Sequence, residues 1–263
     1  MMLHIILVIV IVYAGIALLF YFLQDFFFFR PEILPQDFKY EYPFPFEEKH
    51  FDLPDSGRIN AIWFKVPNRL GVVYFLKGNS RSIKGWGKFA KDYVGKGYDF
   101  FMMDYRGFGK SKGRRSEEII NNDIEYVYNW LTTQYKQSEI VVLGRSLGCG
   151  FAARVAAWNT PKMLILDSPY YSFQFQIQRF AWWLPLRWIL RYKIPTYQYL
   201  KSVKCPVFII HGDHDFLISY DQGMRLQQEN PDKTSLITIK GGRHNNLPSF
   251  ESYHKALYKI LNS

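Results

Sequence analysis

Side chains of the kinds used for nucleophilic attack on a carbonyl occur at three places in this sequence. Ser146 lies in "VVLGRSLGCG", at the end of an apolar run typical of a buried strand. Asp213 and Asp215 lie in "FIIHGDHDFLIS", and His244 lies in "TIKGGRHNNLPSF". A serine hydroxyl becomes a nucleophile when a histidine takes its proton and a carboxylate orients that histidine. The order Ser, Asp, His along the chain is one of the orders in which such a triad occurs.

The glycines on either side of Ser146 indicate a sharp turn from a strand into a helix. Gly144 and Gly148 allow the strand and the following helix to approach closely, which pushes the serine hydroxyl out at the strand end. Gly-x-Ser-x-Gly alone is a weak signal. The strand predicted before it and the small-residue helix predicted after it make the signal more specific.

Apolar runs alternate with longer amphipathic stretches along most of the chain. We expect strands in the regions 49–54, 61–67, 71–76, 98–104, 139–144, 162–167, 206–212 and 235–241. We expect helices near 84–96, 117–136, directly after Ser146, near 219–229 and near 248–261. This alternation predicts an α/β fold, with a mostly parallel central sheet and helices on both faces. Such sheets bind ligands at the carboxyl ends of their strands, where the candidate residues would converge.

The chain resembles the α/β-hydrolase superfamily. The matching stretches are "FLKGNS", "MDYRGFGKSKG", "LGRSLGCG", "LDSPYYS", "IIHGDHDFLIS" and "GGRHNNL", and they span residue 45 to the C-terminus. The resemblance is strongest to the single-pass membrane-anchored branch, which is close to serine aminopeptidase-like and monoglyceride lipase-like proteins. It implies the α/β-hydrolase fold and an activated serine.

The resemblance also implies a role for each site residue. The His-Gly-x-x-Asp pattern selects Asp215 as the acid, with Asp213 and Asp167 as alternatives. Ser146 is then the nucleophile and His244 the base, while His211 is a structural histidine of its motif.

Two backbone amides are expected to form an oxyanion hole, those of Leu147 and Asn79. The family usually has His-Gly-Asn before the second amide, where this chain has Lys77-Gly78-Asn79. Three interpretations of Lys77 stay open: it pairs with an acid, it favours an anionic substrate, or it is a partly exposed lysine with no role.

Composition narrows the range of partners. The formal net charge is +10, but no nucleic-acid-binding motif or basic tail accompanies it, so we expect no nucleic-acid partner. The "HGDHD" stretch lacks the further spaced histidines of a dinuclear site, so we expect neither a metal nor another cofactor. Cys149 and Cys205 are interpreted as small core residues, consistent with a reducing compartment.

The N-terminus contains an apolar run long enough to cross a bilayer. Residues 3–23 have one polar side chain, His4, and about 20 apolar residues suffice for a membrane-spanning helix. A cleavable signal peptide is the alternative, but no Lys or Arg precedes the run. We expect a transmembrane anchor over residues 1–25 and a linker over 26–46. Arg30 and Lys39 follow the run, which favours a single-pass protein with its large domain on the cytoplasmic side.

We expect a hydrolase domain over residues 47–263, with a cap insertion at about 170–200. Residues 170–198 are rich in aromatics and contain four Lys or Arg residues and no acid. These aromatics either lie at a membrane interface or pack the cap onto the domain. The first interpretation predicts a membrane-anchored serine hydrolase that cleaves a small acyl or lipid-like ester or thioester. The alternatives are a serine peptidase of the aminopeptidase-like group and a non-catalytic membrane-tethered scaffold.

Overall fold

A computed structural model describes all 263 residues of the chain. Its centre is a single eight-stranded sheet with the order β1-β2-β4-β3-β5-β6-β7-β8. The strands are β1 (Phe46–Asp52), β2 (Arg58–Phe64), β3 (Gly71–Leu76), β4 (Tyr98–Met103), β5 (Ile140–Arg145), β6 (Met163–Asp167), β7 (Val207–Gly212) and β8 (Thr234–Ile239).

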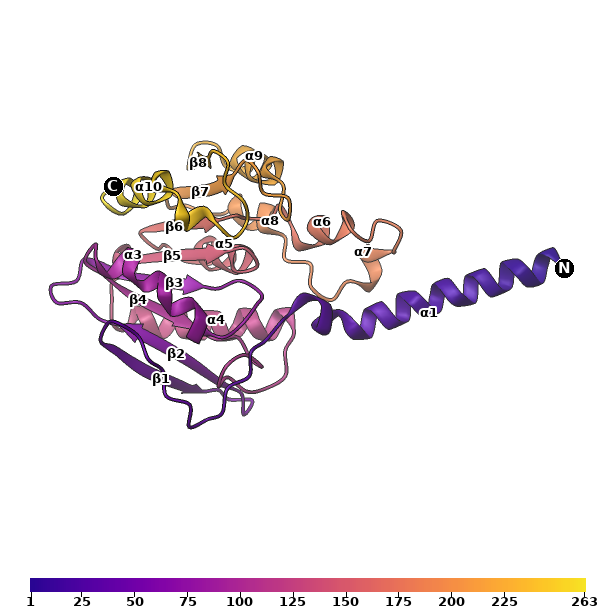
Figure 1. Cartoon of the computed structure of the whole chain (residues 1–263), viewed down its shortest axis with the longest axis horizontal. Coiled ribbons are helices and arrows are strands. Elements are labelled where there is room, and N and C mark those ends of the chain that lie inside the picture. Colours follow the sequence, from indigo (N-terminus) through magenta and orange to yellow (C-terminus); the bar gives the residue numbers. More distant parts are fainter.

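The sheet is mostly parallel, as the alternating pattern predicted. Only β2 runs against its neighbours, and it pairs antiparallel with both β1 and β4. The pairs from β4 through β3, β5, β6 and β7 to β8 are all parallel. The carboxyl ends of β3, β5, β7 and β8 therefore lie along one edge (Figure 1). Ser146 directly follows β5, Asp215 follows β7, His244 follows β8, and Asn79 follows β3.

Helices cover both faces of the sheet because alternate strand residues point to opposite sides. Val72 and Tyr74 of β3 belong to a core that includes residues of α4 and α5, whereas Val73 and Phe75 belong to a second core with residues of α3 and α10. The helices of the domain are α2 (Ile83–Trp86), α3 (Lys91–Val94), α4 (Glu117–Thr132), α5 (Gly148–Trp158), α6 (Phe173–Gln178), α7 (Leu186–Ile189), α8 (Thr196–Leu200), α9 (Tyr220–Glu229) and α10 (Glu251–Leu261).

The helix expected near residues 84–96 is broken into three short pieces. α2 and α3 are separated by a 3₁₀ turn over Gly87–Ala90. Gly85 and Gly87 lower the helix propensity of this stretch. A Cβ at Gly87 would also overlap the ring of Tyr42, so close packing against Tyr42 requires a glycine at this position.

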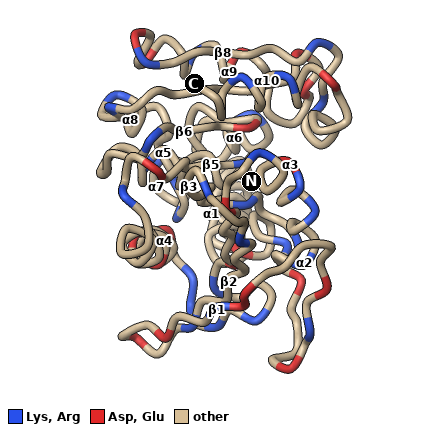
Figure 2. Tube along the Cα trace, turned by 90° about the vertical axis from the view of Figure 1, so that its left-hand side faces the viewer, with Lys and Arg blue, Asp and Glu red and all other residues tan.

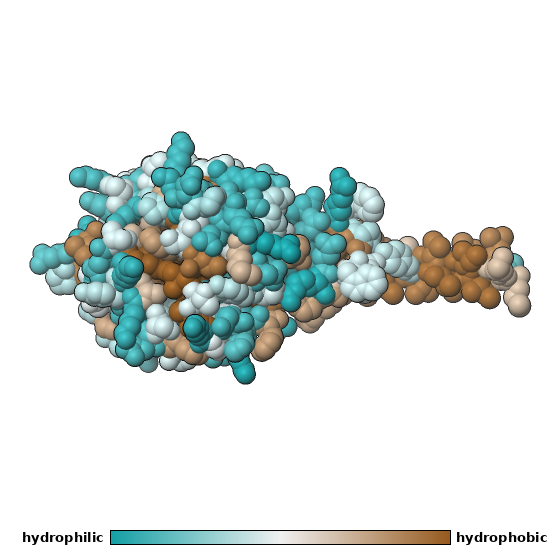
Figure 3. Space-filling model, turned by 90° about the horizontal axis from the view of Figure 1, so that it is seen from above, coloured by the Kyte–Doolittle hydropathy of each residue, from teal (hydrophilic) through white to brown (hydrophobic).

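The N-terminal run forms one 27-residue helix, α1 (Met2–Phe28), that is long and apolar enough to cross a membrane. It projects from the domain as an apolar rod (Figure 3). The helix does not end at residue 25, the expected limit of the anchor, but continues to Phe28. The last of these residues is held by the domain, because Phe28 is buried against Phe173 and Tyr192.

The insertion after β6 forms a cap from α6, α7 and α8, and the base of α1 is bonded to it (Figure 1). The Gln24 side chain donates to the carbonyl of Ile189 at 2.8 Å and accepts from the amide of Arg191 at 2.9 Å. Tyr192 donates its hydroxyl to Asp25 at 2.8 Å. These bonds fix the lower end of α1 relative to the cap.

Candidate active site

Ser146 occupies the turn between β5 and α5 in left-handed backbone geometry, with φ of +51°. The flanking glycines are required by close packing. A Cβ at Gly144 would lie 2.6 Å from Cα of Cys149, and one at Gly148 would lie 2.7 Å from the carbonyl oxygen of Lys77. A larger residue at either position would separate α5 from the sheet. The turn thus has the strained geometry of a nucleophile elbow.

A continuous hydrogen-bonded chain links Ser146, His244 and Asp215. Nε2 of His244 lies 3.0 Å from Oγ of Ser146, and Nδ1 lies 2.8 Å from Oδ2 of Asp215. The Asp215 side chain is fully buried, and that of His244 is largely so. Because the carboxylate accepts from Nδ1–H, Nε2 is left as the proton acceptor that faces the serine hydroxyl.

The Asp215 carboxylate is stabilised in its charged form. Burial alone would raise its pKa, but hydrogen bonds from His211 and His244 outweigh burial and hold the pKa of Asp215 well below its usual range. Its Oδ1 also accepts from the amides of Leu217 and Ile218, at 3.0 and 2.9 Å. Asp215 therefore stays ionised beside His244 at neutral pH.

The alternative acids have other partners. Asp213 accepts from the amide of Gly241 at 2.7 Å. Asp167 accepts from Arg145 at 2.8 Å and from the hydroxyl of Tyr253 at 2.9 Å. Neither is bonded to His244, so among the three candidate acids Asp215 alone completes the chain.

Leu147 and Asn79 both line the space in front of Ser146. Neither N–H donates a hydrogen bond within the structure, so both are free to bind an oxyanion. Asn79 is held by the end of the N-terminal helix. Its side-chain amide donates to the carbonyl of Phe28 at 3.1 Å, and its own carbonyl accepts from the amide of Arg30 at 2.9 Å.

Lys77 is fully buried and does not face the space in front of Ser146. Its ammonium lies 3.6 Å from Asp104 and donates to the carbonyl of Arg81 at 3.2 Å. Burial lowers the pKa of Lys77 to about 8 despite the attraction of Asp104, and burial raises the pKa of Asp104 to about 6. Of the three interpretations, the structure supports the acid-paired one. Asp104 was not identified from the sequence as the partner of Lys77, although it lies in the stretch "MDYRGFGKSKG".

Two cavities meet at Ser146. One, of about 370 Å³, has nine apolar lining residues, which come from α1, the cap and the loops near the serine: Phe27, Phe28, Leu147, Tyr170, Phe173, Ile177, Phe180, Leu217 and Ile218. The other, of about 290 Å³, is mostly polar and includes Arg30, Arg145 and His244. Neither cavity is lined by an Asp or Glu residue. The serine thus lies between an apolar and a basic polar compartment.

Comparison with known proteins identifies the family. A family model described as "Serine aminopeptidase, S33" matches residues 67–202, more than half of the chain. The chain belongs to this family. The match and the structural neighbours confirm the α/β-hydrolase fold and superfamily that the sequence motifs predicted, and they make this protein an α/β hydrolase.

Individual relatives are distant. An uncharacterised protein of Mycobacterium tuberculosis is 28% identical over 197 residues, which cover 73% of this chain and 69% of that protein. Alpha/beta hydrolase domain-containing protein 17C of Xenopus tropicalis is 26% identical over 201 residues, covering 74% of this chain and 63% of that protein. The structure of an esterase from Pyrococcus furiosus superposes with a TM-score of 0.67 at 19% identity, covering 89% of this chain and 98% of that one. At this identity the esterase supports the fold alone.

Proposed function

We propose that this α/β hydrolase is a membrane-anchored serine hydrolase that cleaves an acyl ester or thioester of a lipid-like substrate. One observation carries the proposal. The hydrogen-bonded chain from Asp215 through His244 to Ser146 opens onto an apolar cavity, and Phe27 and Phe28 of the membrane-spanning candidate helix form part of the cavity wall.

In the first half-reaction, Oγ of Ser146 attacks the acyl carbonyl while Nε2 of His244 takes the hydroxyl proton. Asp215 holds the imidazole in the tautomer that can accept this proton and stabilises the imidazolium that forms. The amides of Leu147 and Asn79 bind the oxyanion, and each contributes about 3 kcal/mol, the typical value for one such donor. His244 then passes its proton to the departing oxygen or sulfur.

The second half-reaction repeats these steps with water. His244 removes a proton from a water molecule, whose oxygen attacks the acyl-serine carbonyl, and the same two amides bind the second oxyanion. Collapse of this intermediate breaks the bond between the acyl carbon and Oγ of Ser146. The proton returns from His244 to Oγ, and the free acid leaves.

Exposed aromatics around the cap support a substrate drawn from the bilayer. Phe180, Trp182 and Trp188 are 62%, 76% and 80% exposed, and Phe26, in the last turn of α1, is 78% exposed. Large aromatic side chains are enriched at the level of lipid headgroups. Because Phe180 also lines the apolar cavity, this cavity is well placed to receive an acyl chain from the membrane.

The residues around Ser146 also argue against the two alternative functions, a serine peptidase and a non-catalytic scaffold. An aminopeptidase needs an acid for the substrate's free amine, and the cavities at Ser146 offer cations instead. A non-catalytic scaffold has no need for a bonded Ser146–His244–Asp215 chain with two unoccupied amides beside it. The cytoplasmic location of the domain remains our proposal, based on Arg30 and Lys39 following α1.

The test is covalent labelling of the detergent-solubilised full chain with a fluorophosphonate, alongside hydrolysis of a series of acyl esters and thioesters. We expect the wild type to be labelled and Ser146→Ala to be unlabelled. Asp215→Asn should lower kcat by about 10⁴-fold, because the wrong histidine tautomer is then favoured.

Asp213→Asn is the matched control, since Asp213 lies two residues away and is not bonded to His244. Labelling that survives in Ser146→Ala, or equal effects of the two Asp→Asn substitutions, would contradict the assigned mechanism. A folded wild type that neither labels nor hydrolyses any acyl substrate would favour the scaffold instead.

A further inference from the structure

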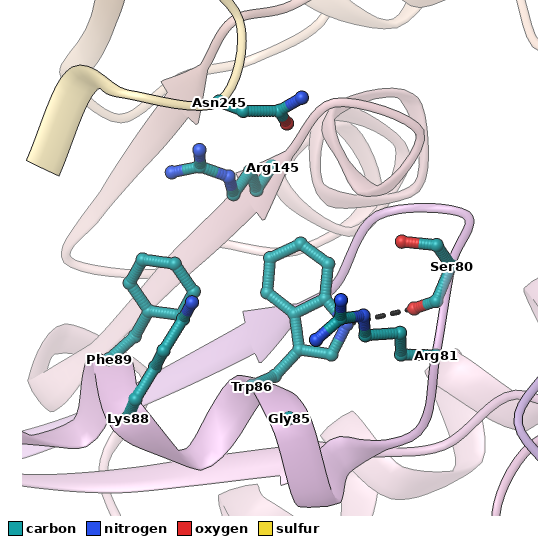
Figure 4. Close-up of a pocket in the computed structure, with 8 residues that line it drawn as sticks. All are labelled: Ser80, Arg81, Gly85, Trp86, Lys88, Phe89, Arg145 and Asn245. Carbon is teal, nitrogen blue, oxygen red and sulfur yellow. Dashed lines mark hydrogen bonds between the residues drawn. The ribbon is translucent and has the colours of Figure 1, made fainter.

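We propose that a basic groove next to the catalytic serine binds a phosphate group carried by the leaving group of the substrate. The inference rests on the proposed function and adds a substrate class to it: acyl esters or thioesters whose alcohol or thiol bears a phosphate. The groove has a volume of about 310 Å³, and its charged lining residues are Arg81, Lys88 and Arg145 (Figure 4).

The three compartments around the site follow one another in a row. The apolar cavity and the polar cavity share Ser146 and Asn79 among their lining residues. The polar cavity and the basic groove share Ser80, Trp86, Arg145 and Asn245, whereas the apolar cavity and the basic groove share no residue. A substrate with its carbonyl at Ser146 and its acyl chain in the apolar cavity would therefore extend its leaving group toward the groove.

The groove has positive charge that the protein does not neutralise. Neither Arg81 nor Lys88 has an acidic side chain within ion-pair distance, and no Asp or Glu lines the groove. Lys84, on the same short segment, is by contrast paired with Glu32 at 3.3 Å. Figure 2 shows several Lys and Arg positions around α2 and α3. Two unpaired cations in one concave site suit a dianion, and a guanidinium and an ammonium are both common phosphate ligands.

The back of the groove is rigid. Arg145 is buried, and its guanidinium donates to Asp167 at 2.8 Å and to the carbonyl of His244 at 3.2 Å. The same guanidinium lies over the ring of Phe89, 5.1 Å from its centroid. Trp86 donates its indole N–H to the carbonyl of Ser80 at 2.9 Å (Figure 4). These contacts link the wall of the groove directly to the loop that carries the catalytic histidine.

Arg81 has the backbone strain expected at a functional position. Its φ is +56°, a left-handed conformation that is costly for a residue with a side chain. The conformation is maintained by its neighbours, because its amide donates to Arg30 at 2.9 Å and its carbonyl accepts from Lys77 at 3.2 Å. These two bonds hold Arg81 at the groove, directly after the loop that carries Asn79.

The chemistry needs no additional reactant. Oγ of Ser146 forms a bond to the acyl carbon, and the bond from that carbon to the leaving oxygen or sulfur breaks. His244 delivers the serine proton to this oxygen or sulfur, and the alcohol or thiol departs with its phosphate unchanged. The charge of the groove acts on binding of the leaving group and not on the acyl carbonyl.

The experiment compares substrates matched in acyl chain and differing only in phosphate. One pair is 1-acylglycerol 3-phosphate and 1-acylglycerol, and the other is acyl coenzyme A and the acyl thioester of N-acetylcysteamine. We expect the wild-type full chain, in detergent, to have the higher kcat/KM for the phosphate-bearing member of at least one pair. The pair that shows the preference distinguishes a lipid headgroup from a nucleotide-bearing thiol as the source of the phosphate.

The double variant Arg81→Gln/Lys88→Gln should lower that preference at least about tenfold, which is the lower end of the effect of losing one hydrogen bond to a charged group. Lys84→Gln is the matched control and should leave the preference unchanged. If the wild type favours the neutral member of both pairs, or if the double variant retains the wild-type preference, the groove is not a phosphate site. Fluorophosphonate labelling of Ser146 separates this result from a failure of the proposed hydrolase, because labelling does not depend on a phosphate.

Discussion

Replacing Asn79 with alanine tests whether the N-terminal helix positions the oxyanion loop, which is the segment 77–81 that carries the Asn79 amide. Three hydrogen bonds link residues 28–30 to residues 79–81. The Asn79 side chain donates to Phe28 at 3.1 Å, the Arg30 amide donates to Asn79 at 2.9 Å, and the Arg81 amide donates to Arg30 at 2.9 Å. Asn79→Ala removes the first of these bonds and leaves the backbone amide that would bind the oxyanion.

The expected loss can be estimated from the bond removed. A neutral hydrogen bond contributes about 0.5–1.5 kcal/mol net, which corresponds to about 2- to 12-fold in rate if all of it is used to position the amide. Loss of an oxyanion donor itself would cost about 10²–10³-fold. We therefore expect kcat for an acyl ester to fall several-fold in Asn79→Ala, with a parallel decrease in the rate of fluorophosphonate labelling.

The matched control is Gln36→Ala. Like Asn79, Gln36 has a side-chain amide that donates to a distant backbone carbonyl, that of Lys110, at 3.1 Å. Gln36 does not line the cavities at Ser146. This variant should retain the wild-type rate. A loss of about 100-fold or more in Asn79→Ala would mean that the side chain itself stabilises the transition state. An unchanged rate would mean that the loop keeps its shape without the helix.

Two further predictions concern the ionisation of Asp215 and of the Lys77–Asp104 pair, and a third concerns the volume of the apolar cavity. Because the pKa of Asp215 is held below its usual range, its ionisation stabilises the fold above about pH 4, and this stabilisation is lost as the pH falls further. Asp215→Asn should therefore show a shallower decrease in Tm than the wild type as the pH falls from about 5 to about 3. An equal decrease in the two proteins would refute this. Lys77→Met should destabilise the protein by about 3 kcal/mol at neutral pH, because it leaves the Asp104 carboxyl buried and unpaired. The pKa of Asp104 should then rise above its present value of about 6, so Tm should fall as the pH rises from 6 to 8, a range in which the Lys77–Asp104 pair contributes little slope in the wild type. A second substitution, Asp104→Asn, should remove that slope. Ile177→Trp should fill part of the apolar cavity and shift the preference in an acyl ester series toward shorter chains; an unchanged chain-length profile would place the acyl chain elsewhere.

Local sequence patterns predicted the class of fold, and together with the family resemblance they predicted the side chains that are bonded to one another at the serine. Strands and helices depend on periodicity over a few residues, and the sharp turn at Ser146 depends on its flanking glycines, so both can be recognised locally. Asp215 and His244 each follow a predicted strand, and the parallel topology brings such positions to one edge of the sheet. The helix expected near 84–96 forms, but it is interrupted by a 3₁₀ turn over Gly87–Ala90, where Gly87 packs against Tyr42, a contact that no local pattern records.

The contribution of the rest of the chain to the site depends on contacts between residues far apart in the sequence. The pairing of Lys77 with Asp104 joins the ends of two neighbouring strands, and the bond from Asn79 to Phe28 joins the oxyanion loop to the N-terminal helix. The apolar cavity combines residues of that helix with residues of the cap, more than a hundred positions away. Such contacts depend on which surfaces pack together once the sheet has formed. Because packing is set by the whole fold, short-range sequence patterns could identify the catalytic candidates but could not reveal the compartments on either side of them.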